Sequence, residues 1–415
     1  MQSFHRIRYC MFEPVAERMR AAAEEGEGSP IFRAKEVLRP SYLPDRLPHR
    51  EEHITRLTRV LADAVRMGSP VNIVLSGAMG TGKTSTVKHV TRDLETRAHV
   101  VYINSEIFDT PYRVVAYLAR KFNKRVPMIG WPAELLYAEL KSAIDAEVRH
   151  VIVIVDEFEM LVHNGDETFA YLLRLNRELK QAQVSFICLA DDLSFSKFQN
   201  SKARSAASWK GLRFLPYTTD ELKDILYDRV ELAFVADALE ESVIPLCAAL
   251  ANSGLGDAGY ALELLRVSGE IAEQSGGKLV RADHVRYASE HIAQSREAER
   301  ITALPVQQKL VLSAVLSLGR DRRSSRFSSG EVYNRYCELC THMGLNVLTQ
   351  RRFSDFIAEL DALELLTAEV VSRGRYGRSK VISLRIPAEF LQPVLFGDAQ
   401  LRALSFVEER TTVAV

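Results

Sequence analysis

Short apolar runs alternate with helical patterns between about residue 50 and residue 215. The runs are VNIVLSG, HVVYIN, HVIVIVDE, VSFICLA and GLRFLPY. Continuous β-branched runs that are separated by helices are typical of a parallel sheet covered on both faces. The pattern therefore predicts an α/β domain built on a parallel sheet.

The pattern changes twice after that domain. From TTDELKDILYDRVELAF to about Gln294 it is helical only, which predicts a small helical domain. A further unit, from Leu304 to about Leu395, reads as three helices followed by LLTAEVVSRGRYGRSKVISLRI. That last segment predicts two strands joined by a basic turn that contains glycine. Three helices and a β-hairpin together predict a winged helix.

These changes divide the chain into predicted domains. They are an N-terminal arm (residues 1–30), an α/β base domain (31–216), a helical domain (217–295), a winged-helix domain (296–400) and a tail (401–415). The arm is predicted from the stretch AAAEEGEGSP, which indicates a loose segment or a short helix. A chain of 415 residues is long enough for two or three domains, each with its own core.

Composition and charge are those of an ordinary soluble protein, with 47% hydrophobic and 26% charged residues. The formal net charge is zero, so attraction to DNA must come from local basic patches. The five cysteines form no disulfide framework in a chain of this length, and CELC reads either as a zinc half-site or as two thiols. No signal peptide or membrane-spanning run is evident. We therefore expect a cytoplasmic protein with no membrane partner.

The stretch LSGAMGTGKTSTVKHV follows an apolar run and precedes a helical pattern. It contains a full match to G-x-x-x-x-G-K-[ST], the loop that holds nucleotide phosphates. Its backbone amides are expected to face the phosphates at a helix N-terminus. Lys83 adds a positive charge, and the Thr84 hydroxyl is a ligand for Mg²⁺. The predicted nucleotide-binding residues here are Gly77, Ala78, Met79, Gly80, Thr81, Gly82, Lys83, Thr84 and Ser85.

The run HVIVIVDEFEML ends in an acidic pair, Asp156 and Glu157. Beside a phosphate loop, Asp156 is expected to hold Mg²⁺ through its water shell, and Glu157 is expected to polarise the attacking water. Taken alone, such a pair could also cap the next helix. No Asn-Lys-x-Asp guanine-binding motif occurs, which favours adenine. The expected ligands are therefore ATP or ADP with Mg²⁺.

Several segments, taken in order, resemble one protein family. They are SYLPDRLPHREEHITRL, the phosphate loop, DEFE, LPYTTDELKDIL, GDAGYALELLRVSGEIAE and VVSRGRYGRSK. The set is similar to that of the archaeal origin-recognition and cell-division-control type AAA+ replication initiators, over about Ile31 to Leu395. The resemblance implies an AAA+ base domain, an α-helical lid and a C-terminal winged helix that grips origin DNA.

The resemblance also implies a pocket for adenine. The role of packing on the base falls to Leu43 and Pro44, with Arg50 nearby, although Pro44 would also suit a purely structural loop. Tyr217, in LPYTTDELKDIL, is assigned to the same nucleotide site. The region from Ser105 to about Trp131 corresponds to a helix pair that touches DNA in the family. Its basic residues, which could equally form a solvated face, are Arg113, Lys121, Lys124 and Arg125.

Three positions depart from the family pattern. Asp191 stands where the family has an asparagine near the γ-phosphate, and an acid there repels that phosphate. Lys202, with Arg204 two positions on, stands where the family has an arginine finger. Lysine is less suited to hold a phosphoryl group, because it lacks the two-pronged donor geometry of a guanidinium. Gly259 replaces the lid arginine. An arginine finger contributes about 10³ to 10⁵ in rate, so we expect firm nucleotide binding but slow or absent hydrolysis.

The segment SRGRYGRSK is the candidate DNA-binding wing. Glycine lets the backbone approach a groove, arginine suits phosphates or a narrow minor groove, and tyrosine can contact sugar. A solvated hairpin is the alternative interpretation. The candidate residues are Arg373, Gly374, Arg375, Tyr376 and Arg378, with Lys380 beside them. A second basic stretch, GRDRRSSRF, is more typical of a surface loop.

The segment TQRRFSDFIAELDALELL is the candidate recognition helix. Thr349 is expected to cap it, which places Gln350, Arg351 and Arg352 in the first turn as DNA-binding candidates. Acids farther along the helix weaken its positive field. The residues predicted to be core by their helical spacing are Phe353, Phe356, Ile357, Leu360 and Leu363.

The function predicted from these features is that of an ATP-binding replication initiator. It recognises origin duplex DNA through its winged helix and AAA+ core and helps to recruit the replicative helicase, with other initiator paralogues as further partners. It is at most a slow ATPase, and it is expected to work in the cytoplasm at the nucleoid. The alternative is a diverged paralogue that acts as a nucleotide-bound DNA-binding regulator without initiator activity, and the missing lid arginine favours it.

Overall fold

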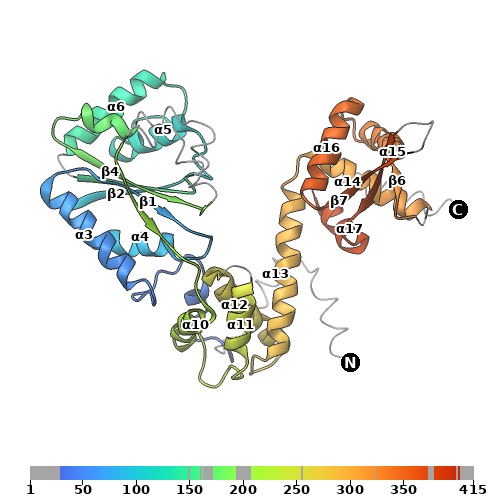
Figure 1. Cartoon of the computed structure of the whole chain (residues 1–415), viewed down its shortest axis with the longest axis horizontal. Coiled ribbons are helices and arrows are strands. Elements are labelled where there is room, and N and C mark those ends of the chain that lie inside the picture. Colours follow the sequence, from blue (N-terminus) through green and yellow to red (C-terminus); the bar gives the residue numbers. More distant parts are fainter. Residues whose placement is uncertain are drawn as a thin grey trace. The chain divides into compact units, whose positions relative to one another are not determined.

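The computed structural model describes residues 29–147, 150–158, 161, 172–192, 207–253, 256–322, 324–372, 378–398 and 401. The chain forms two compact units, Met1–Ala288 and Ser289–Val415. Figure 1 shows the elements of both. The first unit contains the parallel sheet and the helical lid, and the second contains the winged helix.

The first unit is built on a five-stranded sheet with the order β2-β3-β4-β1-β5. Every neighbouring pair is parallel. Its strands are β1 (Asn72–Ser76), β2 (Ala98–Asn104), β3 (His150–Asp156), β4 (Gln183–Ala190) and β5 (Trp209–Arg213). Each strand coincides with one of the apolar runs, which confirms the predicted α/β fold class.

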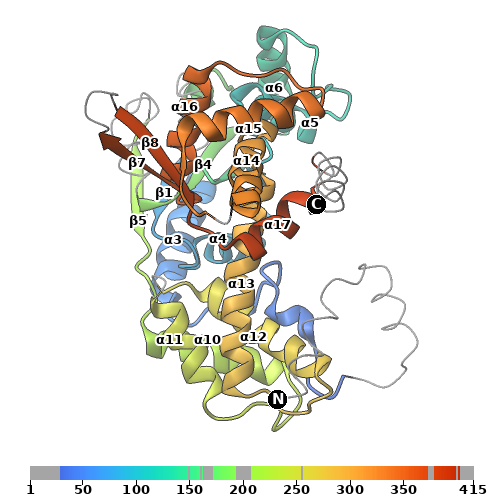
Figure 2. The ribbon, with the colours of Figure 1, turned by 90° about the vertical axis from the view of Figure 1, so that its right-hand side faces the viewer.

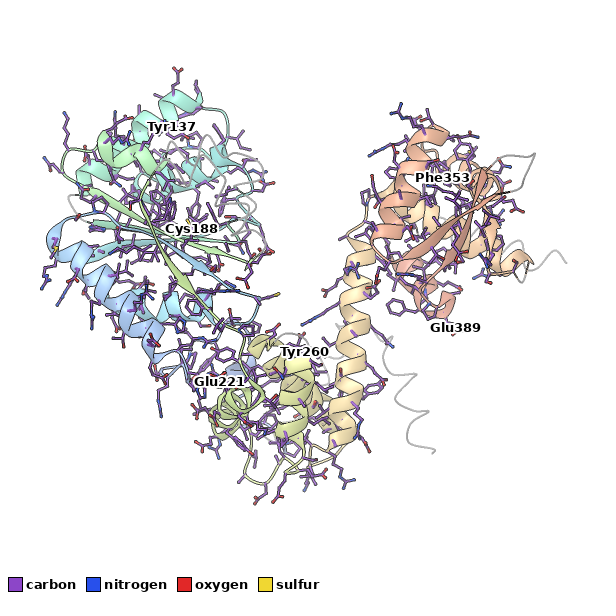
Figure 3. The ribbon with its side chains drawn as sticks, viewed as in Figure 1. Tyr137, Cys188, Glu221, Tyr260, Phe353 and Glu389 are labelled. Atoms are coloured by element: carbon purple, nitrogen blue, oxygen red, sulfur yellow. The ribbon has the colours of Figure 1, made fainter. Side chains whose placement is uncertain are left out.

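Helices cover the sheet on both faces (Figure 1). They are α3 (Glu51–Met67) and α4 (Lys83–Arg92) on one face, and α5 (Pro111–Phe122) and α6 (Ala133–Glu147) on the other. In β3, Val151 and Val153 join the core under α5 and α6, whereas Ile152 and Ile154 join the core under α3 and α4. Burial on both faces is the reason why the strand sequence is continuously apolar. Figure 3 marks Cys188 of β4 inside this layer.

A bundle of helices, the lid, follows the sheet in sequence, as Figures 1 and 2 show. Its elements are α10 (Thr219–Ala233), α11 (Val243–Ser253), α12 (Ala258–Gln274) and the beginning of α13 (Ala282–Thr302), a helix that continues into the second unit. Thr218 and Glu221 form a reciprocal capping box at the start of α10. The Asp257 side chain accepts a hydrogen bond from the Tyr260 amide at the start of α12. Glu221 and Tyr260, labelled in Figure 3, mark these two helix starts.

Residues 31–38, which the sequence analysis places in the base domain, pack on the lid. Phe32 pairs with Phe234 just after α10, with ring centroids 4.9 Å apart. A Cβ atom at Gly269 of α12 would lie 2.3 Å from the Phe32 ring, so a larger residue there would displace that ring. The 3₁₀ helix η1 (Lys35–Leu38) continues this contact with α10 and α12. The chain therefore reaches the sheet only after passing the lid.

The second unit is a winged helix, as predicted. Its elements are α14 (Val306–Arg322), β6 (Phe327–Ser328), α15 (Ser329–His342), α16 (Gln350–Ala362), β7 (Leu366–Ser372), β8 (Arg378–Leu384) and α17 (Ala388–Gly397). The strands form an antiparallel sheet in the order β6-β8-β7. The sequence analysis predicts neither β6, which has two residues, nor α17, which contains Pro393.

Four of the five predicted core residues of α16 are buried, and Phe353 is labelled in Figure 3. Leu363 is the exception, because its exposed fraction is 38%. It is the C-cap residue of α16, and Glu364 after it has a φ of 63°, in the left-handed region. The helix ends before Leu363 can follow the apolar face inward, so the prediction that it is core was wrong.

Each helix within the described ranges, taken singly, falls short of the length and hydropathy needed to cross a membrane. The pair Ala282–Thr302 and Val306–Arg320 passes the test only when both are taken together, and they are bent by 116°. Residues of the second helix, including Leu310, Val311 and Val315, are buried in the core of the C-terminal unit.

A buried ion pair joins two helices of the C-terminal unit. Lys309 Nζ of α14 lies 2.5 Å from Oδ2 of Asp398 at the end of α17, and the two side chains are 4% and 9% exposed. A buried charge that loses its partner is costly, because neither water nor an opposite charge then stabilises it. The pair therefore fixes how α17 docks on the winged helix.

We predict that Asp398→Leu lowers the free energy of unfolding of the C-terminal unit by about 3–5 kcal/mol. The double change Lys309→Met with Asp398→Leu should recover most of this loss, since no buried charge then remains. Hydrogen exchange of α14 and α17 amides in the full-length chain measures both effects. A double variant as unstable as the single one would contradict this account.

Candidate nucleotide-binding site

The predicted phosphate loop lies between β1 and α4, and its glycines have backbone conformations that other residues rarely adopt. The φ angles of Gly80 and Gly82 are 72° and 84°. A Cβ atom at Gly82 would lie 2.7 Å from the Tyr217 hydroxyl, so a side chain there would collide with its neighbour. Gly82 is also the N-cap of α4, which directs the first amides of that helix toward the loop.

Charged and polar groups meet at the base of this loop. Lys83 Nζ donates to the carbonyl oxygens of Gly77 and Ala78, at 2.8 and 2.9 Å. Thr84 Oγ1 donates to Asp156 Oδ2 at 3.0 Å, which brings the two predicted metal ligands together. A hydroxyl and a carboxylate are the hard oxygen donors that Mg²⁺ prefers, so the residues present fit a Mg²⁺-nucleotide.

Asp156 has a further partner that sequence reasoning missed. The Tyr102 hydroxyl donates to Asp156 Oδ2, the oxygen that also accepts from Thr84. Burial raises the pKa of Tyr102, which keeps the hydroxyl protonated and able to donate. No local sequence signal marks Tyr102, because the register of β2 on β3, which pairs Asn104 with Asp156, brings it near this sheet edge only in the folded chain.

Glu157 follows β3 with a φ of 52°, in the left-handed region. Such a conformation is uncommon for a residue with a side chain, and it costs about 1–3 kcal/mol where it is held in place. The Phe158 amide donates to the carbonyl oxygen of Leu189 at 3.0 Å, which ties the turn after β3 to the end of β4. The turn thereby places Glu157 on the same cavity as Asp191, which follows β4.

A cavity of about 740 Å³ lies against the loop, a size suited to a nucleotide. It is lined by the segment before α3, the phosphate loop, the ends of β3 and β4, the second half of α10 and the start of α12. Of the predicted site residues it brings together Pro44, Met79, Gly80, Thr81, Gly82, Lys83, Thr84, Ser85, Asp156, Glu157, Asp191 and Tyr217. Lys202 and Arg204 lie outside the described residues.

Arg50 supports the loop from behind rather than lining the cavity. Its side chain is 5% exposed and donates to three backbone carbonyls, those of Thr81 (3.0 Å), His49 (2.8 Å) and Leu215 (2.8 Å). The guanidinium carbon also lies 3.8 Å from the centroid of the Tyr217 ring. Burial lowers the pKa of Arg50 from its usual value, but an arginine remains charged. Leu43, Gly77 and Ala78 likewise lie outside the cavity lining.

The lid contacts the phosphate loop through the start of α12. The Ala258 amide donates to the carbonyl oxygen of Gly80 at 3.2 Å. A Cβ atom at Gly80 would lie 1.7 Å from Asp257 Oδ1, so any larger residue would displace the start of α12. Gly259, in the first turn of α12, also lines the cavity. Lining residues that sequence reasoning missed include Tyr42, Ile225, Asp228, Arg229, Glu231, Leu232 and Leu262.

The first turn of α16 presents Gln350, Arg351 and Arg352, all exposed, and Thr349 caps it by accepting from the Arg352 amide. Two acids partly neutralise Arg352, whose NH1 lies 3.9 Å from Asp355 and 3.8 Å from Glu359. Wing residues Arg373, Gly374, Arg375 and Tyr376 lie outside the described residues, and Arg378 is the first residue of β8.

The basic groups predicted beside these have local partners in several cases. On α5, Arg113 pairs with Asp109 at 2.9 Å, and Lys121 Nζ lies 5.1 Å from the centroid of the Tyr117 ring. Arg326, before β6, pairs with Glu369 of β7. Of the cysteines, Cys337 and Cys340 lie on α15, and within the described residues no cluster of three or more metal-ligating side chains occurs.

Three family models match the chain in the order of its structural elements. The model described as an AAA ATPase domain matches residues 46–187, and the Cdc6 AAA+ ATPase-type lid domain matches residues 223–290. The model of the CDC6 C-terminal winged helix domain matches residues 299–392. Together they match β1 to β3 and most of β4, most of the lid, and the winged helix.

Archaeal relatives are similar along nearly the whole chain. The ORC1-type DNA replication protein 1 of Methanosarcina acetivorans is 44% identical over 395 residues, which cover 93% of this chain and 95% of that protein. The ORC1-type DNA replication protein of Pyrococcus abyssi is 45% identical over 386 residues, which cover 90% and 92%. The structure of the Aeropyrum pernix ORC1 protein in complex with DNA has a TM-score of 0.79 and 38% identity, and covers 91% of this chain and 100% of that one.

We predict that Arg50→Lys weakens ADP binding by roughly tenfold, because one ammonium group cannot satisfy the carbonyls that the guanidinium holds. Equilibrium binding of ADP with Mg²⁺ measures the change. Arg66→Lys, at a 72% exposed side chain on α3, is the matched control and should bind like the wild type. Equal affinities for the two variants would show that Arg50 does not shape the loop.

Proposed function

The chain belongs to the archaeal Orc1/Cdc6 family of AAA+ replication initiators, and we propose that it is an ATP-binding initiator that recognises origin duplex DNA. The observation that carries this proposal is the cavity, which gathers the phosphate loop, Asp156 and the lid around a space of nucleotide size. The relative of known structure in complex with DNA, 38% identical, supports the DNA-binding part. ATP or ADP with Mg²⁺ would be the resident ligand.

DNA would be gripped by both the winged helix and the AAA+ core. On the winged helix, the first turn of α16 is exposed and carries Arg351, and the wing adds Arg373, Arg375 and Arg378. On the core, α5 and the residues after it supply a second basic group. Phosphate contacts of this kind position a protein on a duplex, whereas base contacts specify the sequence.

ATP hydrolysis would be slow, so the protein would act as a switch and at most as a slow ATPase. Lys83, Thr84 and Asp156 would hold the phosphates and Mg²⁺, and the hydrogen bonds of Lys83 to the loop and of Thr84 to Asp156 support this. The groups that act on the γ-phosphate are altered, since Asp191 and Gly259 line the cavity where the family has asparagine and arginine. An acid close to a polyanionic phosphate opposes its binding.

Recruitment of the replicative helicase, alone or with other initiator paralogues, would follow origin binding in the cytoplasm, at the nucleoid.

A second candidate function is that of a nucleotide-bound regulator without initiator activity. The observation that favours it is Gly259, because glycine cannot make the contact with the γ-phosphate that the lid arginine makes in the family. The two functions differ in sequence preference, so binding to origin repeats and to promoter duplexes should be compared. Preference for promoter DNA, with no helicase loading, would favour the regulator.

We predict that single-turnover ATP hydrolysis is at least about 10³-fold slower than in fast AAA+ motors. The change Gly259→Arg, combined with Asp191→Asn, should raise the rate, because it restores a cation and removes a negative charge at the γ-phosphate. The same pair with Glu157→Gln is the control and should stay inactive. A wild-type rate comparable to that of a motor, and abolished by Glu157→Gln, would overturn the slow-switch proposal.

We predict that Arg375→Ala weakens binding to most duplexes and reduces the slope of log affinity against log salt by about one unit, as the loss of one phosphate contact should. Arg352→Ala is the comparison, and it should change the slope less because Asp355 and Glu359 already offset its charge. Fluorescence anisotropy over a salt series measures both. An unchanged slope for Arg375→Ala would remove the wing from the DNA contact.

A further inference from the structure

Tyr102 of β2 connects its strand to the end of β3. The strand register pairs Tyr102 with Ile154, two residues before Asp156. Side chains two residues apart on a strand point to the same face of a sheet, so Tyr102 and Asp156 share a face. On this face the Tyr102 ring packs against the core under α3 and α4, and its hydroxyl donates to Asp156 Oδ2. A side chain of the neighbouring strand therefore contacts one of the two predicted metal ligands.

Hydrogen bonds hold the Asp156 carboxylate by both of its oxygens. Oδ2 accepts from the Tyr102 hydroxyl and from Thr84 Oγ1, and Oδ1 accepts from the Glu157 amide at 3.1 Å. Thr84 is itself a predicted metal ligand, and both Thr84 and Glu157 line the cavity. Tyr102 lies outside the cavity lining. Its hydrogen bond therefore holds Asp156 from the side that does not face the nucleotide.

The Tyr102 ring is held by the core and by helix α4. It packs against the cluster of buried side chains that includes Ile152 and Ile154 of β3. Lys88 Nζ of α4 lies 4.6 Å from the centroid of the ring, which is a cation–π contact. A side chain whose rotamer is set by packing can orient a neighbouring ligand, because its hydrogen bond then has a fixed direction. Tyr102 meets this condition.

We propose that Tyr102 is a positioning residue of the magnesium site, which fixes the direction in which Asp156 receives the water shell of Mg²⁺. This rests on the Mg²⁺-nucleotide binding proposed above and adds a metal specificity to it. Mg²⁺ requires near-octahedral geometry and keeps several waters, whereas Ca²⁺ accepts flexible geometry. An oriented carboxylate therefore favours Mg²⁺, and loss of the Tyr102 hydroxyl lowers the preference for Mg²⁺ over Ca²⁺.

The test compares Tyr102→Phe with the wild type and with Tyr112→Phe. Tyr112 is the matched control, because its hydroxyl donates to the Trp131 carbonyl oxygen at 2.9 Å and it lies outside the cavity lining. The affinity of each protein for a non-hydrolysable ATP analogue is measured with Mg²⁺, with Ca²⁺ and with EDTA. The melting temperature of each nucleotide-free chain is measured as well.

For Tyr102→Phe we expect about tenfold weaker binding with Mg²⁺, the size typical for loss of a group that orients a metal ligand. Binding with Ca²⁺ should weaken less, and binding with EDTA should match the wild type. Tyr112→Phe should bind like the wild type in all three conditions, although each variant loses one hydroxyl donor and should melt slightly lower. A purely structural role for Tyr102 would not produce a loss that depends on the metal.

Unchanged affinity of Tyr102→Phe with Mg²⁺ would overturn the inference. An equal loss with Mg²⁺ and Ca²⁺ would show that Tyr102 does not orient the carboxylate, and an equal loss with EDTA as well would assign it a purely structural role. Equal wild-type affinity with Mg²⁺ and with EDTA would also overturn the inference, because the site would then hold no metal. Failure of the wild type to bind the analogue in every condition would instead refute the proposed function itself.

Discussion

The contact between Gly80 and Asp257 is the constraint on which the nucleotide site depends. The phosphate loop and the start of α12 approach so closely that even a methyl group at Gly80 would overlap the aspartate, and the Ala258 amide donates to the loop carbonyl. Since Asp257 also caps α12, one side chain sets the direction of a lid helix and the shape of the loop. Any movement of the lid away from the phosphate loop must therefore break the contact of Asp257 and Ala258 with Gly80.

Much of this arrangement could be predicted from sequence, because each strong local signal has a single structural solution. Five apolar runs became five parallel strands, and a glycine pattern identified the loop, since only glycine tolerates the φ angles at Gly80 and Gly82. What sequence could not provide was contact between distant segments. Tyr102, Tyr42 and Arg229 reach the site across strands or from the lid, and no local spacing marks them. The prediction that Leu363 is buried was wrong for a different reason. The helical spacing of apolar residues continues to Leu363, but the helix ends at Ala362.

The cavity contains two groups of functional side chains, one for binding the nucleotide and one beside the expected position of the γ-phosphate. Lys83, Thr84 and Asp156 are held by mutual or loop hydrogen bonds, an arrangement that suits durable binding. Glu157 and Asp191 lie on the turns after β3 and β4 and line the same cavity. On the proposed function, Glu157 polarises the attacking water, and the negative charge of Asp191 opposes the γ-phosphate. On the proposed function, the energy of nucleotide binding serves to set conformation, and turnover contributes little.

The path of the chain has a mechanical consequence for the lid. Residues 31–38 pack on α10 and α12, so the polypeptide crosses from lid to sheet ahead of α3 and returns from sheet to lid after β5. Arg50 ties the two crossings together, because it follows the first and donates to Leu215 on the second. A body attached by two neighbouring tethers can swing about the line that joins them but resists twisting. We therefore expect the lid to open by rotation about the line that joins the two connections.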